Sequence, residues 1–238
     1  MKRLLLLTLL LTIPKAFADF DLPVFKNWQM MEDSEVVEDE KVRMNCYLFK
    51  NYIILEKEEP GFLGKTLYYK ENKILKKTAP ESYCKDIKVD TFKKLDSSGA
   101  SFYGSYKHLL FVQDPDELSA RTKFEVYNLE TGVLTYSGIK NNNTQMKIIP
   151  MSLKTTALEY YQRYLVDCDF NSDKMHLRCW NDFLASIEVP AAVKVPYPNC
   201  PRSKNPKKLQ IFLKVQVADV QKSKRTFLWS KPICEIAP

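Results

Sequence analysis

Six cysteines constrain this chain more than any other feature of its 238 residues. They fall along the sequence as an early, a middle and a late pair: Cys46 and Cys84, Cys168 and Cys179, Cys200 and Cys234. Six cysteines can pair in many ways, and the sequence alone does not choose among them. An even number of cysteines in an exported chain is typical of a disulfide framework, and their placement in three successive pairs favours disulfides between sequence neighbours. No Cys-x-x-Cys motif is present, which argues against a redox pair or a zinc ribbon.

Residues 1–18 have the pattern of a secretory signal peptide. Lys2 and Arg3 precede an apolar run at 4–13, and the small residues at 16–18 match what signal peptidase recognises. The apolar run is too short to span a bilayer as a helix. We therefore expect a mature chain that begins near Asp19, has no transmembrane segment after cleavage, and is periplasmic or secreted.

Short segments rich in β-branched and aromatic residues, with frequent turn residues between them, predict a mainly antiparallel β protein. A compact apolar run occupies 108–113, a hairpin is predicted at 123–138, and apolar residues alternate along 209–220. Two stretches are ambiguous. Residues 155–166 fit an amphipathic helix or a strand rich in tyrosine, and we favour the strand. Residues 180–189 could form a short helix capped by Asn181.

We expect a single mainly-β domain over 19–238, built as a sandwich or as a small barrel-like or propeller-like sheet and stapled by disulfides. A proline-rich segment, 190–208, leads to a predicted terminal hairpin at 209–236. The stretches LYYKENKIL and VYNLETGVL are similar, and the second resembles the outer hairpin of a β-propeller blade. A propeller needs several blades at a regular period. The sequence has no third copy in register, so we do not assign the chain to that family.

Charge is distributed unevenly along the chain. The formal net charge is +7, and it includes three basic residues of the expected leader. Acidic residues dominate 19–60, whereas basic residues dominate 201–226. Such a basic stretch suits an anionic polymer, lipid headgroups or an acidic partner, although it is more often a solvated face. Nucleic acid is a poor match for a partner, because the chain is expected to be exported, its net charge is modest and it has no nucleic-acid recognition motif.

The segment DCDFNSDKMHLRC at 167–179 has two interpretations. Four oxygen-bearing residues alternate as calcium ligands do: Asp167, Asp169, Asn171 and Asp173. The loop departs from the EF-hand pattern, because Ser172 replaces the glycine and Arg178 replaces the bidentate glutamate. Calcium therefore stays an alternative.

A disulfide-stapled hairpin accounts for more of this segment, and it is the interpretation we favour. In one register Cys168 lies opposite Cys179, with Phe170 opposite Leu177 on the same apolar side. Asp169 then faces Arg178 on the other side, as a favourable cross-strand charge pair.

The sequence has no assembled catalytic motif and no cofactor-binding motif. It has two histidines, His108 and His176, and lacks both a Gly-x-Ser-x-Gly nucleophile elbow and a glycine-rich phosphate loop. Asp114 and Asp116 could supply the paired carboxylates of glycoside hydrolysis. The proline between them is more typical of a turn.

We therefore expect a non-enzymatic binding or interaction module that acts on an envelope component or a protein partner. The partner would be an envelope or extracellular protein or an anionic polymer, and no cofactor is expected. The alternative is a hydrolase of cell-wall or glycan substrates that uses carboxylates. Aromatic residues beside basic ones are candidate contact residues: Tyr103, Tyr106, Tyr160, Tyr161, Tyr164, Tyr197, Trp180 and Trp229.

Overall fold

A computed structural model describes residues 20–32, 41–58, 64–73, 84, 87–97, 99–114, 121–141, 143–152, 155–166, 168, 176–200, 209–222, 225–228 and 230–236. The expected signal peptide lies outside these residues. The described part of the chain is mainly antiparallel β, with one α-helix and three disulfides. The predicted fold class is therefore confirmed.

The first sheet is a meander of five antiparallel strands in the order β1-β2-β3-β4-β5. Their bounds are Phe25–Glu32 for β1, Lys41–Leu48 for β2, Tyr52–Glu58 for β3, Lys65–Glu71 for β4 and Lys93–Lys94 for β5. A short 3-10 helix, η2, covers Val89–Thr91 just before β5.

The second sheet has nine strands, of which seven follow the order β13-β12-β11-β9-β8-β7-β6. Strands β10 and β14 pair with β11 and β12, respectively. The bounds are Ser101–Tyr106 (β6), Leu109–Gln113 (β7), Arg121–Asn128 (β8), Val133–Asn141 (β9), Lys147–Pro150 (β10), Thr156–Leu165 (β11), Leu209–Val217 (β12), Arg225–Phe227 (β13) and Ile233–Ile236 (β14). A 3-10 helix, η4, covers Val220–Lys222.

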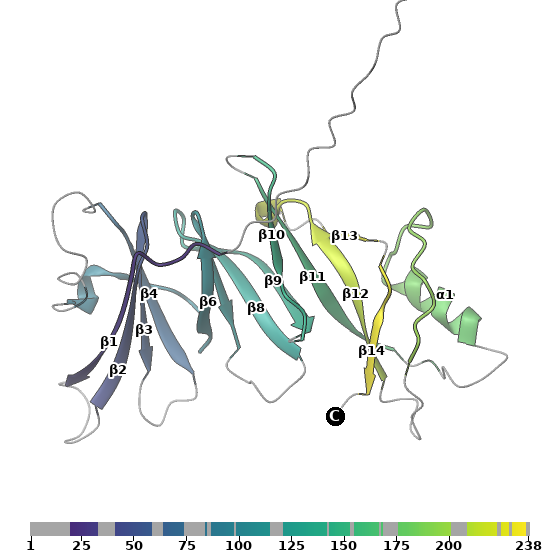
Figure 1. Ribbon diagram of the computed structural model, residues 1–238, viewed down its shortest axis with the longest axis horizontal. Coiled ribbons are helices and arrows are strands. Elements are labelled where there is room, and N and C mark those ends of the chain that lie inside the picture. Colours follow the sequence, from purple (N-terminus) through teal and green to yellow (C-terminus); the bar gives the residue numbers. More distant parts are fainter. Residues whose placement is uncertain are drawn as a thin grey trace, which may run out of the picture.

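The two sheets form three layers, because the strands of the second sheet lie in two of them. Strands β6–β9 lie between the first sheet and the layer of β10–β14 (Figure 1). Strand β7 contributes to the cores on both sides of this middle layer. Leu110 and Val112 pack in the cluster shared with the first sheet, whereas Leu109 and Phe111 pack in the cluster shared with β10–β12. A strand buried on both faces has no polar side, which explains the unbroken apolar run at this position.

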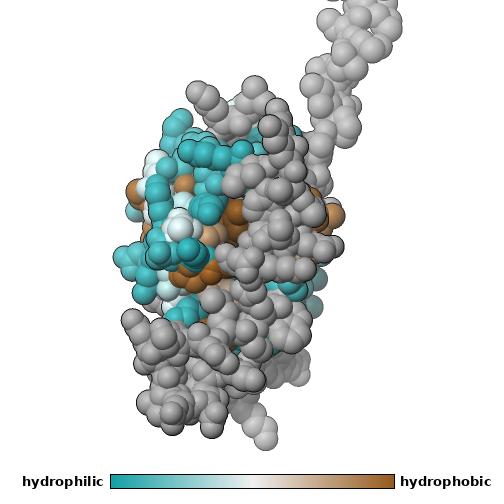
Figure 2. Space-filling model, turned by 90° about the vertical axis from the view of Figure 1, so that its left-hand side faces the viewer, coloured by the Kyte–Doolittle hydropathy of each residue, from teal (hydrophilic) through white to brown (hydrophobic). Residues whose placement is uncertain are grey.

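The outer side of the first sheet also carries apolar residues. Met44 and Leu48 of β2 pack there with Ile53 of β3, and the Cys46–Cys84 disulfide holds a further chain segment against this side. Seen from this side, hydrophobic residues appear near the centre of the face with hydrophilic residues around them (Figure 2).

The three disulfides join the pairs expected from their order in the sequence: Cys46–Cys84, Cys168–Cys179 and Cys200–Cys234. Their Cα–Cα distances are 5.9, 5.8 and 5.0 Å, respectively. Three disulfides indicate an oxidising compartment, because thiols stay reduced in the cytosol. In the part of the chain that the structure describes, no helix is long and apolar enough to cross a membrane.

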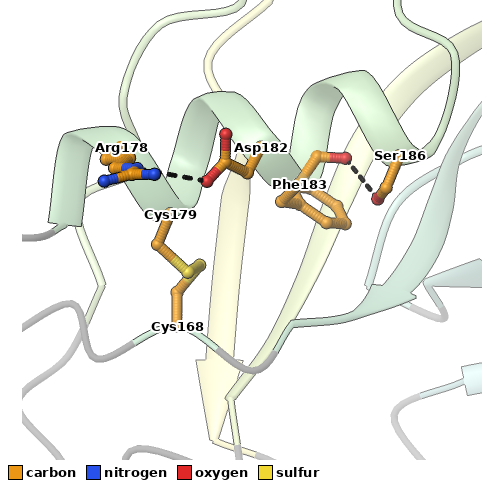
Figure 3. Close-up of a disulfide and its surroundings, with 6 residues drawn as sticks. All are labelled: Cys168, Arg178, Cys179, Asp182, Phe183 and Ser186. Carbon is orange, nitrogen blue, oxygen red and sulfur yellow. Dashed lines mark hydrogen bonds and ion pairs between the residues drawn. A yellow bond between two sulfur atoms is a disulfide. The ribbon is translucent and has the colours of Figure 1, made fainter.

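The Cys168–Cys179 disulfide does not staple a hairpin, so that prediction was wrong. Leu177 and Cys179 lie on helix α1, His176–Ser186 (Figure 3). Because Arg178 is on the same helix, its guanidinium faces Asp182 at 3.9 Å, one turn further along, and takes no part in a strand register. Asn181, considered as a cap, lies inside this helix.

The helix forms because its apolar residues follow the helical period. Trp180, Phe183 and Leu184 of the helix, with Ile187 just after its last residue, recur at i, i+3, i+4 and i+7, which places them on one face. This face packs in a cluster with Ile211 and Leu213 of β12. The helix therefore buries its apolar stripe on the third layer, a contact that the cysteine spacing alone does not reveal.

Two further predictions concern strands of the C-terminal half. Residues 156–165 form strand β11, as favoured over a helix. Strand β12 pairs with β13 and β14, as expected of a chain that turns back on itself, and also with β11 on its other side. The terminal strands are therefore a continuous part of the sheet.

Candidate ligand groove

A groove of about 590 Å³ lies where the first sheet meets the turn between β8 and β9. Its volume is within the range of small-molecule sites, roughly 300–1,000 Å³. The residues that line it come from the first sheet, from η2 and from the β8–β9 turn: Tyr52, Tyr69, Lys70, Glu71, Lys73, Thr91, Lys93, Leu129 and Glu130.

The base of the groove continues the core between the first two layers. Tyr52, Tyr69 and Leu129 are buried and belong to the same apolar cluster. In the sheet register Tyr52 lies opposite Glu71, and Tyr69 lies opposite Lys93. Because the tyrosines are fixed by this cluster, the groove is held open without a ligand.

Gly132 allows the β8–β9 turn to close over the tyrosine base. Its φ of +76° is in the left-handed region that favours glycine. A Cβ at this position would lie 2.5 Å from the Tyr69 hydroxyl. The turn can therefore approach Tyr69 only because it has a glycine at its tip.

The rim of the groove is charged and more basic than acidic. The Lys73 ammonium lies 3.5 Å from the Glu71 carboxylate, and both side chains are largely exposed. The Lys70 ammonium lies 3.5 Å from the Thr91 hydroxyl. Lys93 is exposed on the edge strand β5. Three lysines against two glutamates leave the rim with a net charge of +1.

The hydroxyl of Tyr52 stays protonated at neutral pH. Burial raises its pKa, and the nearby carboxylates of Glu130 and Glu71 raise it further. The groove therefore offers a neutral phenol beside lysine ammonium groups. An anionic ligand could accept hydrogen bonds from both kinds of donor.

A buried carboxylate of β3 that does not line the groove serves the packing of the two sheets. Glu56 accepts hydrogen bonds from the Asn45 amide at 2.8 Å, the Tyr47 hydroxyl at 3.1 Å and the Phe102 backbone N–H at 3.0 Å. The Lys65 ammonium lies 3.4 Å from it. These partners satisfy the carboxylate, so it joins the first sheet to β6.

The four residues of the calcium alternative, Asp167, Asp169, Asn171 and Asp173, lie outside the described residues. That alternative remains a prediction. Among the residues that the structure does describe, no group of three or more histidine, cysteine, aspartate or glutamate side chains is placed to hold a metal ion.

The structure places Asp114 at the exposed end of β7, and Asp116 lies outside the described residues. Asp114 and Glu125 line a cavity of about 20 Å³, which holds roughly one water molecule. A sugar does not fit there. The His108 Nε2 lies 2.9 Å from the Gln221 amide nitrogen, so this ring nitrogen has a hydrogen-bond partner other than these carboxylates.

Several aromatic residues considered for binding are core residues instead. Tyr106, Tyr160 and Trp180 are buried. The Tyr160 hydroxyl forms hydrogen bonds with the Tyr136 hydroxyl and with the Gln162 amide oxygen. Burial raises the pKa of both Tyr136 and Tyr160. The remaining described members of that set, Tyr103, Tyr161, Tyr164 and Tyr197, are half-buried, and Trp229 lies outside the described residues.

The basic stretch at 201–226 does not form one patch in its described part. The Lys214 ammonium lies 3.0 Å from the Glu159 carboxylate, and that of Lys222 lies 3.5 Å from Asp219. The groove lysines lie elsewhere, at 70, 73 and 93, and no motif in the sequence singles them out. They come together only when β5 pairs with β4, so no local pattern marks them.

Comparison with known proteins gives no further identification: no family model matches the sequence, and no curated protein or solved structure is similar to it.

Proposed function

We propose that this protein is an exported binding module, periplasmic or secreted, whose ligand site is the groove between the first sheet and the β8–β9 turn. The expected signal peptide and the three disulfides support the compartment. The groove supports binding, because it is a preformed hollow of small-molecule size with a charged rim around a base of buried tyrosine and leucine side chains.

The single observation that carries the proposal is the pairing of a buried base with a basic rim. Tyr52 and Tyr69 are held by the core, so they lose little conformational entropy when a ligand binds. Lys73 and Lys93 are exposed and present ammonium groups at the rim. This arrangement favours a ligand that carries a carboxylate or phosphate group.

The test is recovery of a partner from the native envelope by the tagged mature protein, with stoichiometry read by mass spectrometry. The double variant Lys73→Glu/Lys93→Glu reverses two rim charges. The matched control is Lys88→Glu/Lys94→Glu, because both residues are also exposed and Lys94 follows Lys93 on β5 but lies on the opposite face of the strand. We expect the groove variant to lose the partner and the control to keep it. Equal recovery by both variants would contradict the proposal.

A glycan hydrolase is the second candidate, and one observation favours it. Glu71 and Glu130 line the same groove, and both carboxylates act on the Tyr52 hydroxyl. Glycoside hydrolysis commonly uses two carboxylates on either side of the scissile bond. The variants Glu71→Gln and Glu130→Gln would each abolish glycan cleavage if this candidate is correct. Release of reducing sugar from envelope glycan is the assay, and unchanged release by both variants would exclude these residues.

A further inference from the structure

A second hollow, of about 270 Å³, lies at the β2–β3 turn. The residues that line it come from the segment before β1, from this turn and from the β6–β7 turn: Asp21, Leu22, Val24, Phe49, Lys50, Asn51 and Lys107.

The segment before β1 is anchored at both ends. The Asp21 backbone N–H donates to the Ser105 carbonyl at 2.8 Å, and its carboxylate accepts from the Lys107 backbone N–H at 2.6 Å. Further along, the Val24 N–H donates to the Leu48 carbonyl at 2.7 Å. The segment thus crosses from the middle layer to the first sheet (Figure 1).

Between these anchors the Leu22 residue is 89% exposed, and Val24 is 55% exposed. Because the backbone on both sides of Leu22 is hydrogen-bonded, the fold itself holds this side chain in solvent. Leu22 and Val24 therefore offer exposed apolar area beside the hollow, which a partner's apolar side chain could remove from water.

The two hollows adjoin through hydrogen bonds between neighbouring turns. The Asn72 N–H donates to the Asn51 carbonyl at 2.7 Å, and the Asn72 amide donates to the Phe49 carbonyl at 2.8 Å. Asn72 lies between Glu71 and Lys73, which line the groove. We call the residues that line the two hollows, as given above, the tip surface.

The tip surface is basic. It carries five lysines, at 50, 70, 73, 93 and 107, and three acidic residues, at 21, 71 and 130. The Asp21 carboxylate accepts from the Lys107 backbone N–H, and Glu71 lies 3.5 Å from Lys73, so five lysines against three carboxylates leave a formal net charge of +2. The exposed lysines therefore give the surface a positive potential next to the exposed apolar side chains.

We propose that the tip surface binds an acidic segment of a partner protein that also carries apolar side chains. This inference rests on the proposed function and extends it, because it names the partner and adds the second hollow to the site. Carboxylates of the segment would meet the ammonium groups of Lys50, Lys73 and Lys93. An apolar side chain would pack against Leu22, which removes that leucine from water.

The probe is a fluorescently labelled copolymer of glutamate and tyrosine, titrated with the mature protein and followed by fluorescence anisotropy. The test variant is Leu22→Ser/Lys50→Glu. The matched control is Leu165→Ser/Lys194→Glu, because Leu165 is 68% exposed and Lys194 is exposed outside the two hollows. All four residues are at the surface, so both variants should keep the melting temperature of the wild type.

We expect the test variant to bind the copolymer about tenfold more weakly and the control to bind like the wild type. Labelled dextran sulfate should bind more weakly than the copolymer and should not respond to Leu22→Ser, because it has no apolar side chain. No binding of the copolymer, equal weakening in the control, or equal binding of dextran sulfate would each overturn the inference.

The two proposals fail in different ways. If Lys73→Glu/Lys93→Glu loses the envelope partner while Leu22→Ser/Lys50→Glu retains it, the groove is a ligand site and the wider tip surface is not. If both variants retain the partner, both proposals are wrong.

Discussion

Phe20 immediately follows the expected start of the mature chain, and its contacts make a sharp prediction. Its ring packs edge-on against Tyr103 at 5.2 Å and Phe111 at 5.0 Å, between ring centroids. It also covers Gly104, where an added Cβ would lie 2.6 Å from two ring carbons. The ring and a side chain at position 104 would therefore occupy the same space.

The magnitudes follow from this geometry. Removing a fully buried phenylalanine side chain costs about 3–5 kcal/mol. Phe20 is only partly buried, so we expect Phe20→Ala to lower the free energy of unfolding by about 2 kcal/mol. Gly104→Ala should cost a similar ~2 kcal/mol, because the methyl group displaces the ring from its contacts.

The double variant separates this account from a general loss of stability. Once the Phe20 ring is gone, the methyl group at position 104 enters vacant space. Gly104→Ala should then cost less than about 0.5 kcal/mol in the Phe20→Ala background. The two substitutions should therefore couple by about 1.5 kcal/mol, and the double variant should be little less stable than Phe20→Ala alone.

Urea unfolding of the mature protein under non-reducing conditions measures these energies, provided that the slope m is the same in all variants. Leu22→Ala is the control, since that leucine lies two residues away and is 89% exposed. It should change stability by no more than about 0.5 kcal/mol. Costs of Phe20→Ala and Gly104→Ala that simply add would refute the account, because they would show that the ring does not fill the space above Gly104.

Further predictions concern a disulfide, a buried carboxylate and a buried phenol. Cys168→Ser/Cys179→Ser opens a loop with a sequence separation of 11 residues, and urea unfolding should show a loss of about 3 kcal/mol; a loss near zero would contradict it. Glu56→Ala should cost about 3 kcal/mol in the same assay, because it leaves buried donors and the Lys65 ammonium without their acceptor. Burial raises the pKa of Tyr164 from 10.0 to about 12. Between these pH values the unfolded chain releases the proton that the folded chain keeps, so stability falls as pH rises through this window. Tyr164→Phe should flatten this decline, and an identical pH profile would show that Tyr164 does not cause it.

The strands were predictable from the sequence because local patterns determine them. Alternating or continuous apolar residues mark β7, β8, β9 and β12, and glycine marks the β8–β9 turn, where Gly132 has a positive φ. The cysteine pairing also followed from sequence order, since each disulfide connects neighbouring cysteines along the chain.

Helix α1 shows where a local rule misled the prediction. Cysteine spacing suggested that Cys168 and Cys179 face each other on two strands, whereas the apolar residues from Trp180 to Ile187 follow a helical period. A disulfide needs only two nearby Cα atoms, here 5.8 Å apart, and places no demand on the secondary structure of either residue. The periodicity was the better guide.

The sequence by itself predicted export, and it determined the β class, most strand positions and the apolar residues available for a core. Those properties depend on composition, on side-chain period and on residues close together in the chain. Only the tertiary structure decided that three layers form, that Tyr160 and Trp180 are core residues, and that Tyr52, Lys73, Lys93 and Glu130 share one groove. The physical reason is that burial and proximity between distant residues depend on how sheets stack, and no local pattern encodes that stacking.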